Sequence, residues 1–183
     1  PYFTEMDAKP AYYDNGIVKS HPQIPKILRQ AGEQGFIGTT FDYDHLGSQT
    51  PLCCALSMSH IIQTANNHIP GYIGLTSGAA DLIKTFGSQL LFEQYVPKMM
   101  AGQWSGTMAL TEPQAGSSLS DIKCKATRRD DGAFNIKGQK IFISGGDVEG
   151  VENIVHLTLA RIEGAPAGTR GISLFVVPKL RPD

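Results

Sequence analysis

Residues 108–118 carry the residue types in this chain that are best suited to binding chemistry. A short apolar strand breaks there at Pro113 and turns through Gly116 into the hydroxyl residues Ser117 and Ser118. Proline has no amide proton to offer a sheet, and a glycine turn leaves backbone amides pointing outward without a crowding side chain. Such a turn suits a pyrophosphate. An ordinary exit from a strand into a loop would use the same residues, so this segment alone leaves both interpretations open.

Two other groups of polar residues invite a metal-site hypothesis. Asp42, Asp44 and His45 lie close together in an irregular segment, and Asp-rich loops are typical of solvated turns. His60 and His68 lack matched partners at the spacing of metal ligands. We therefore interpret both groups as structural and predict no metal site.

Composition and charge are those of an ordinary globular protein. The chain has 183 residues, of which 41% are hydrophobic and 18% charged, so it can bury a core. A net charge of -1 without runs of like charge gives no reason to bind nucleic acid or an anionic membrane. No stretch reaches the roughly 20 apolar residues of a membrane span, and the N-terminus lacks a signal-peptide pattern. Cys53, Cys54 and Cys124 form neither a disulfide framework nor a CxxC pattern, which indicates a reducing compartment.

The first half of the chain is predicted to be mainly helical. Residues 1–23 mix aromatic residues with prolines and show no clear period, so we expect an extended arm that docks through its aromatic side chains. Apolar positions at helical spacing predict a helix over residues 25–34. Most residues of 52–67 are apolar or small, which predicts a central core helix buried on most of its surface.

Two more helices are expected before residue 103. The first spans residues 76–86, with Thr76 placed as its N-cap. Ser88 then caps the next helix, which Pro97 interrupts. The methionine pair just beyond Pro97 is interpreted as part of the core, because methionine at such positions usually fills core space.

After Gly102 the period of the sequence changes from 3.6 to 2, which is typical of strands. Asp131-Gly132 marks a tight turn between two alternating segments and so predicts a hairpin. The expected strands lie at 122–127, 134–137, 141–143, 154–162 and 171–177.

We therefore predict a multi-domain α and β protein. An N-terminal helical domain with its extended arm occupies residues 1–103, and an antiparallel β-barrel or sandwich forms a middle domain over residues 104–183. Helices followed by strands in this order are unusual for a single core, which favours the division into two domains.

Three motifs in a fixed order make the chain resemble the acyl-CoA dehydrogenases. Residues 95–97 read YVP and precede Gly102, residues 110–117 read LTEPxAGS, and residues 138–144 read GQKxFIS. Their order and separation are much more specific than any single motif. The resemblance covers residues 32–178, and the segment 160–173 is most similar to a longer bacterial branch of the family.

The resemblance implies a fold and a cofactor. The family has an N-terminal helical domain, a middle β domain and a C-terminal four-helix bundle, with FAD held between the last two and across a subunit interface. Only the first two domains are represented in these residues, so we expect the bundle to be absent from this fragment.

The resemblance also implies roles for residues of the first segment. The hydroxyl of Thr111 would lie near the pyrimidine edge of the flavin, with the backbone of Met108 and Leu110 alongside. Gly116 and Ser117 would hold the pyrophosphate.

In the second segment, Phe142 would stack against the isoalloxazine face, and Ser144 would donate a hydrogen bond at flavin N5, the atom that receives hydride. An aromatic side chain fixes a stacked ring without charge, and a hydroxyl stabilises charge that develops at N5. Many family members have Trp in place of Phe142, Thr in place of Ser144 and Asp in place of Ser118. Phe still stacks, Ser still donates, and Ser can replace Asp as a local cap.

The implied reaction is α,β-dehydrogenation of an acyl-CoA thioester, with electrons passed to an electron-transfer flavoprotein. The family's glutamate base lies in the absent bundle, so no catalytic residue is assigned here, and Glu112 is interpreted as structural. We expect the acyl chain to enter a slot lined by the helices of residues 52–86, where Gly74 and Gly78 leave room. The resemblance further implies a homodimer or homotetramer at full length, and a cytoplasmic bacterial protein in preference to one of the mitochondrial matrix.

Three alternatives stay open. An acyl-CoA oxidase on the same scaffold would pass electrons to oxygen. A DNA-associated relative of the alkylation-response type would share the fold, although the near-neutral charge argues against DNA binding. The fragment by itself is expected to be inactive, because a base on one face and a flavin on the other require two walls.

Overall fold

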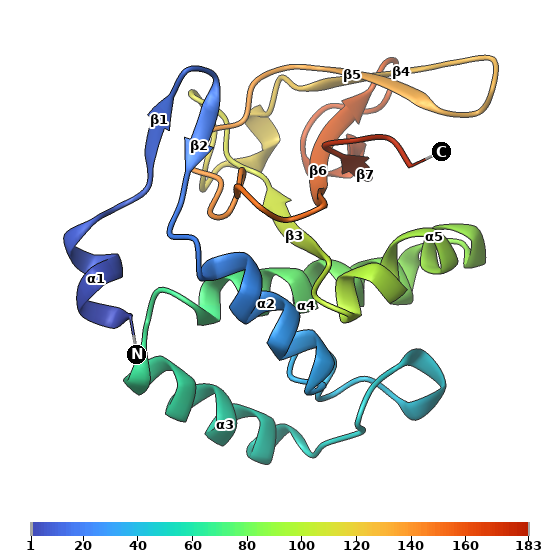
Figure 1. Ribbon diagram of the computed structural model, residues 1–183. Helices are drawn as coiled ribbons and strands as arrows, with labels where there is room; N and C mark the ends of the chain where they lie inside the picture. The colour runs from blue at the N-terminus through green and yellow to red at the C-terminus, as the bar shows by residue number, and fades with distance from the viewer. Residues whose placement is uncertain (1, 183) are drawn as a thin grey trace.

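A group of helices lies on one side of a curled sheet, and a small N-terminal hairpin stands at one end of both (Figure 1). The structure is a computed structural model and describes residues 2–182. Its helices are α1 (Phe3–Ala8), α2 (Ile24–Glu33), α3 (Leu52–Ala65), α4 (Pro70–Phe86) and α5 (Gln89–Met100). Its strands are β1 (Tyr12–Asp14), β2 (Ile17–Lys19), β3 (Trp104–Ala109), β4 (Lys125–Arg128), β5 (Phe134–Lys137), β6 (Asn153–Ile162) and β7 (Ile172–Pro178).

Five of the strands form a mixed sheet around β6. The strand order is β3-β6-β4-β5, and β7 also pairs with β6. The pairs β4–β5 and β6–β7 are antiparallel, but β3 and β4 both run parallel to β6. The predicted order of a helical part followed by a β part is confirmed, whereas the prediction of antiparallel pairing throughout is wrong. Alternation along a strand shows which residues share a face and does not reveal the direction of the neighbouring strand.

The hairpin of the β part was predictable, and one expected strand is missing. β4 and β5 flank a turn in which Gly132 has a φ of 82°, a value that glycine adopts without strain. Residues 141–143 do not form a strand, contrary to expectation. The amide of Ile141 instead donates to the carbonyl oxygen of Thr111 at 2.9 Å, so the alternating isoleucines belong to a loop packed on the end of β3.

The N-terminal segment is more ordered than the expected extended arm. It forms α1 and the hairpin β1–β2, which turns at Asn15 and Gly16 with φ values of 47° and 85°. Two positive φ angles match the twist of the flanking strands, which explains this Asn-Gly pair. Tyr12 and Tyr13 are exposed, so the hairpin does not dock through them, and the buried anchor of the segment is Met6.

Helix α3 is not the buried core helix that its composition predicts. It lies apart from the sheet (Figure 1), and none of its residues is buried. Leu52, Leu56 and Ile61 are 65%, 60% and 67% exposed. Its inner side faces α4 across a cavity of about 150 Å³. Apolar composition indicates that a helix packs against other apolar surface, but it does not identify that surface. Within residues 2–182, only one side of α3 is covered.

Helix α4 begins earlier than predicted, so Thr76 is not its N-cap. Pro70 lies at the start of the helix, where its missing amide proton costs nothing. Thr76 is instead fully buried in the helix interior. Its hydroxyl donates to the carbonyl oxygen of Tyr72 at 2.7 Å and accepts from the amide of Gly106 in β3 at 3.0 Å. Thr76 therefore ties the helical layer to the sheet.

Helix α5 confirms one predicted boundary and corrects another. Ser88 caps its first turn, where its side-chain oxygen accepts from the amide of Leu91 at 3.3 Å. Pro97 lies inside the helix and does not end it, since the helix runs on to Met100. Met99 and Met100 are buried, which confirms their interpretation as core residues.

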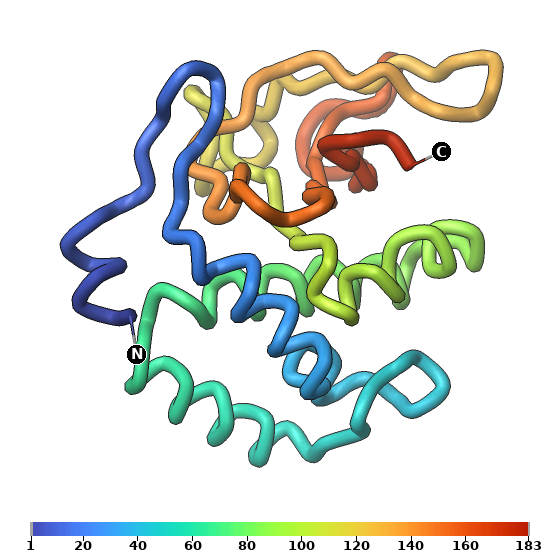
Figure 2. The backbone as a smooth tube through the Cα atoms, in the orientation of Figure 1, coloured from blue at the N-terminus to red at the C-terminus, as the bar shows by residue number. Residues whose placement is uncertain are grey.

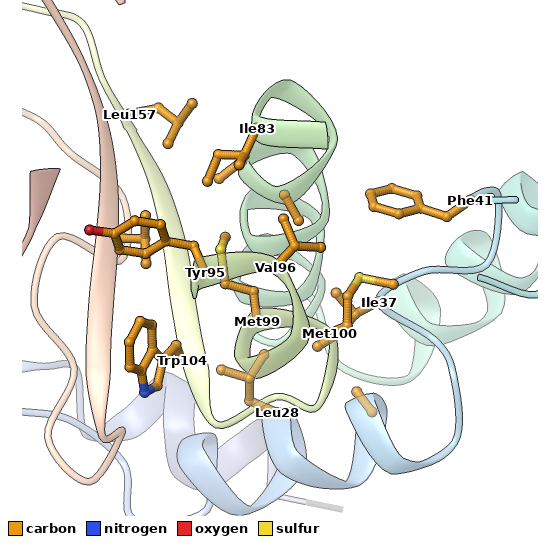
Figure 3. Close-up of a cluster of buried hydrophobic side chains, with 14 residues drawn as sticks. Leu28, Ile37, Phe41, Ile83, Tyr95, Val96, Met99, Met100, Trp104 and Leu157 are labelled. Atoms are coloured by element: carbon orange, nitrogen blue, oxygen red, sulfur yellow. The ribbon is translucent and has the colours of Figure 1, made fainter. Parts of the chain in front are cut away.

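The main core lies between the helices and the sheet. Figure 3 shows side chains of α2, α4 and α5 meeting Trp104 of β3 and Leu157 of β6. The layers approach closely at Gly106, where a Cβ atom would lie 2.7 Å from Cβ of Ala79 and 2.8 Å from Cε of Met99. Glycine is required there because any side chain would push α4 and α5 away from β3.

After α5 the chain enters the sheet at β3 (Figure 2), and the loop before β6 packs back on α2, where Val148 lies with Ile24 and Glu152 pairs with Arg29 at 2.8 Å. The N-terminal hairpin is linked to the β part by an ion pair between Lys19 and Glu149, at 2.7 Å. No helix of residues 2–182 is long and apolar enough to cross a membrane.

Replacing Thr76 with Val is expected to lower the free energy of unfolding by about 1–3 kcal/mol, because the buried amide of Gly106 loses its acceptor. Urea unfolding of the variant measures this. The matched control is Thr64→Val on α3, where the hydroxyl makes the same bond to its own helix but is exposed. Equal losses in the two variants would contradict the helix-to-sheet role of Thr76.

Candidate functional site

The polar turn after β3 is closed by its own backbone. The amide of Glu112 donates to the carbonyl oxygen of Ala115 at 2.7 Å, and the amide of Ala115 donates back at 3.1 Å. Gly116 follows immediately beside Thr111. A Cβ atom at Gly116 would lie 3.6 Å from Cγ2 of Thr111, which is ordinary van der Waals contact. The backbone at Gly116 is therefore open on its outer side, and Ser117 next to it is exposed.

The second polar segment lies against the first, as the motifs required. The amide of Ile141 donates to Thr111, and the ammonium group of Lys140 donates to the carbonyl oxygen of Leu110 at 3.0 Å. These contacts join residues 110 and 111, after the end of β3, to residues 140 and 141, which are 30 positions further along the chain.

Glu112 is the link that fixes both segments. Its side chain is 2% exposed and pairs with Lys140 at 2.8 Å. It also accepts from the amides of Lys123 at 2.6 Å and Cys124 at 3.0 Å, and from the side chain of Gln114 at 2.6 Å. Burial by itself would raise the pKa of Glu112, but the hydrogen bonds, of which the one from Lys140 lowers the pKa most, outweigh it and hold the pKa below its usual range. The structural interpretation of Glu112 is confirmed.

Phe142 has an unusual conformation at the surface. The residue is 88% exposed, and its backbone has a φ of 56°, a left-handed value that bulky residues rarely adopt. Strained backbone of this kind is found mostly at functional sites. Phe142 borders a cavity of about 400 Å³. The other residues around this cavity are Ala109, Lys140, Ile141, Ile143, Gly146, His156, Thr158 and Val177.

A second cavity lies between α4 and the sheet. Its volume is about 320 Å³, and its walls are almost wholly apolar. Gly74 and Gly78 open it on the helix side, since a Cβ atom at either position would meet nothing within 4 Å. The other wall includes Thr107 and Met108 of β3. The two glycines leave room as expected, but this cavity lies between α4 and the sheet and not between the helices of residues 52–86.

The predicted site residues fall into three places. Phe142 lines the 400 Å³ cavity and Met108 lines the apolar one. Leu110 and Thr111 form the junction of the two segments, as described above. Gly116, Ser117 and Ser144 lie outside both cavities, and both serines are exposed.

His156 is a site residue that the sequence interpretation missed. It lies on β6 opposite Thr107 of β3, and its Nδ1 atom is 2.7 Å from the hydroxyl oxygen of Thr107. The available signal was a single histidine within the apolar run of residues 154–162. Within residues 2–182, no group of three His, Cys, Asp or Glu side chains converges as a metal site would require.

Comparisons with known proteins match both halves of the chain. Residues 3–103 match the N-terminal domain of acyl-CoA dehydrogenases, and residues 107–183 match their middle domain. The chain belongs to the acyl-CoA dehydrogenase family. The family predicted from the three motifs is thereby confirmed.

Two curated relatives of this family member are bacterial. The 3-methylmercaptopropionyl-CoA dehydrogenase of Ruegeria pomeroyi is 41% identical over 180 residues, which cover 98% of this chain and 31% of that protein. The broad-specificity linear acyl-CoA dehydrogenase FadE5 of Mycobacterium tuberculosis is 35% identical over 185 residues, which cover 97% of this chain and 29% of that protein. The chain thus spans less than a third of either relative, and the first agrees with the predicted long bacterial branch.

Solved structures share the fold. An acyl-CoA dehydrogenase from Geobacillus kaustophilus superposes with a TM-score of 0.75 at 24% identity, covering 98% of this chain and 43% of that one. A probable acyl-CoA dehydrogenase from Mycobacterium abscessus gives a TM-score of 0.72 at 28% identity, covering 85% of this chain and 40% of that one.

Replacing Glu112 with Gln is expected to lower the free energy of unfolding by about 3–5 kcal/mol, because it leaves the ammonium group of Lys140 buried without its counter-charge. The control is Asp131→Asn, which breaks an exposed pair with Arg129 and should cost about 1 kcal/mol or less. Because the pKa of Glu112 is lower in the folded state, its stabilisation is present above the unfolded pKa and is lost as the pH falls through the folded pKa. The difference between wild type and E112Q should therefore shrink on acidification, and a difference independent of pH would contradict the ion pair.

Proposed function

We propose that this chain is the N-terminal and middle part of an FAD-dependent acyl-CoA dehydrogenase. The reaction is the α,β-dehydrogenation of an acyl-CoA thioester, with electrons passed on to an electron-transfer flavoprotein. The observation that carries the proposal is the contact between the two motifs, in which the amide of Ile141, the neighbour of Phe142, bonds to Thr111 at the start of the turn that leads to Gly116.

The residues present fit a flavin nucleotide. An exposed, uncharged aromatic ring over a cavity of about 400 Å³ suits a planar ring system, and the open backbone at Gly116 suits a pyrophosphate. FAD would supply the acceptor for the hydride that leaves the substrate. Phe142 would fix the plane of the ring, Ser144 would donate a hydrogen bond at its N5 atom, and Gly116 with Ser117 would hold the phosphates.

The remaining predicted residues would orient the other edge of the ring. The hydroxyl of Thr111 would face the pyrimidine edge, with the backbone of Met108 and Leu110 alongside. The ammonium group of Lys140 already donates to the carbonyl oxygen of Leu110, and its buried ion pair with Glu112 holds the end of β3 rigid. A rigid edge places the ring without reorganisation when it binds, which is what a fixed hydride path requires.

The acyl chain would lie in the apolar cavity opened by Gly74 and Gly78. Met108 borders this cavity, so the strand that carries the flavin motif would also form a wall of the substrate site. The proton-abstracting glutamate would come from the C-terminal bundle of the full-length enzyme, opposite the flavin, as in the family.

The domain boundaries, the cellular location and the oligomeric state are part of the same proposal. Residues 1–103 would form the N-terminal domain and residues 104–183 the flavin-binding middle domain. The full-length protein would be a cytoplasmic bacterial homodimer or homotetramer. An oxidase on this scaffold would differ in its electron acceptor, so rapid stoichiometric peroxide instead of reduction of an electron-transfer flavoprotein would overturn the dehydrogenase assignment.

Replacing Ser117 with Trp in the full-length protein is expected to lower the FAD affinity by at least about tenfold, because the bulk blocks the phosphate cradle. The flavin-to-protein absorbance ratio and titration of the apoprotein measure this. Thr127→Trp, at an exposed hydroxyl residue of β4, is the control for bulk alone. Stoichiometric FAD in the Ser117 variant would contradict the phosphate role.

Replacing Gly78 with Leu should narrow the apolar cavity and reduce kcat/KM for long acyl-CoA substrates about tenfold or more while sparing short ones, since several buried methylenes lose their space. Leucine favours a helix, so the fold should persist. Gly71→Leu is the matched control, because Gly71 is an open α4 glycine outside the cavity. Equal losses with long and short substrates would contradict the placement of the acyl chain.

A further inference from the structure

One hydrogen bond connects the walls of the two cavities. Thr107 of β3 and His156 of β6 are paired in parallel register, so their side chains leave the sheet on the same face. His156 borders the 400 Å³ cavity beside Phe142, and Thr107 borders the apolar cavity beside Gly78. The bond of 2.7 Å between Oγ1 of Thr107 and Nδ1 of His156 therefore joins a residue of one lining to a residue of the other.

The environment of Thr107 fixes which ring nitrogen of His156 carries the proton. Thr107 is 1% exposed, and Nδ1 of His156 is the acceptor recorded for its hydroxyl within residues 2–182. A buried hydroxyl proton without an acceptor would cost about 1–3 kcal/mol. The hydroxyl of Thr107 therefore donates to Nδ1, and the proton of the neutral imidazole resides on Nε2.

His156 is neutral near pH 7, and its Nε2–H group remains available as a hydrogen-bond donor. Burial lowers the pKa of His156, with Asp147 acting against this effect and Lys179 adding to it. Asp147 and Lys179 are paired with each other, and Lys140 across the cavity is paired with Glu112. No bond to Nε2 is recorded among residues 2–182, so this N–H is a hydrogen-bond donor on a cavity-lining side chain.

We propose that His156 is a positioning residue of the cofactor site, whose Nε2–H donates to a carbonyl oxygen of the planar heteroaromatic ring bound over Phe142. This inference rests on the proposed function, since it takes that ring to be the flavin. Thr107 acts through His156 by holding its tautomer and orientation. A donor fixed at a ring carbonyl strengthens cofactor binding and stabilises negative charge on the reduced ring.

The proposal separates three side-chain chemistries at position 156. Leucine removes the donor, and glutamine keeps a donor of similar reach without an ionisable ring. In the full-length protein, His156→Leu should raise the Kd for FAD about tenfold and lower the reduction potential of the bound flavin, while His156→Gln should stay within about threefold of the wild type. Thr107→Val should fall between them, because Nδ1 loses its donor and both tautomers become accessible.

The measurements made without substrate are titration of the apoprotein with FAD, the visible spectrum and reduction potential of the bound flavin, and thermal unfolding of each variant. A separate titration of the FAD-loaded protein with an acyl-CoA measures substrate binding. His60→Leu, at an exposed histidine of α3, is the control. If His156→Leu lowers the Tm but leaves the Kd, spectrum and potential unchanged, His156 is only structural and the proposal is overturned. It is also overturned if FAD binding is unchanged and only acyl-CoA binding weakens, because the donor then serves the substrate thioester.

The wild type separates this inference from the proposed function. A full-length wild-type protein that does not bind FAD would overturn both. A wild type that binds FAD with the same affinity and spectrum as His156→Leu would overturn the role of His156 alone.

Discussion

The candidate site depends on one buried charge, the carboxylate of Glu112. Removing a carboxylate from water is costly, and here Lys140, two backbone amides and the side chain of Gln114 offset that cost. These partners come from the turn itself, from the segment before β4 and from the loop that carries Phe142. An unpaired carboxylate at this depth would not be tolerated, so all three segments must take up their positions together. The geometry of the turn before Gly116 and of the loop that carries Phe142 thus follows from the same electrostatic requirement.

The helical and β parts meet with little freedom. Gly106 has no side chain, so α4 and α5 can approach β3 to within contact distance, and Thr76 closes the approach with a hydrogen bond. Gly78 of α4 also has no side chain, and a Cβ atom there would meet nothing within 4 Å, so open space remains beside the helix. The contact and the apolar cavity are therefore two results of small residues on facing elements. A change that moved α4 relative to β3 would alter the cavity and the strand end together.

Much of the β part could be predicted from the sequence, because short-range preferences specify its strands and turns. These preferences are found in the Asp131-Gly132 turn, in the alternating residues around it, and in the apolar runs of β6 and β7. The two motifs at residues 110–117 and 138–144 were also recognisable, because glycine, proline and an aromatic residue at fixed spacing have few structural uses. The sequence could not reveal that β3 and β4 run parallel to β6, because strand direction depends on long-range pairing.

Non-local features account for the other errors. Threonine is a common N-cap residue, but Thr76 lies inside a helix that begins at Pro70. His156 was passed over because its partner, Thr107, is 49 residues away in the sequence. Ile141 and Ile143 alternate as in a strand, yet the backbone of Ile141 bonds to Thr111 instead of a sheet. In each case the residue type permitted two structures, and a contact between distant segments decided between them.

The exposure of α3 has a thermodynamic consequence. A helix of 14 residues that is apolar on most sides and buries none of them gains little free energy from packing. A surface that bound α3 only in its helical form would raise the local stability of this helix by mass action. The opening of α3 would then depend on the concentration of that surface as well as on the sequence of α3.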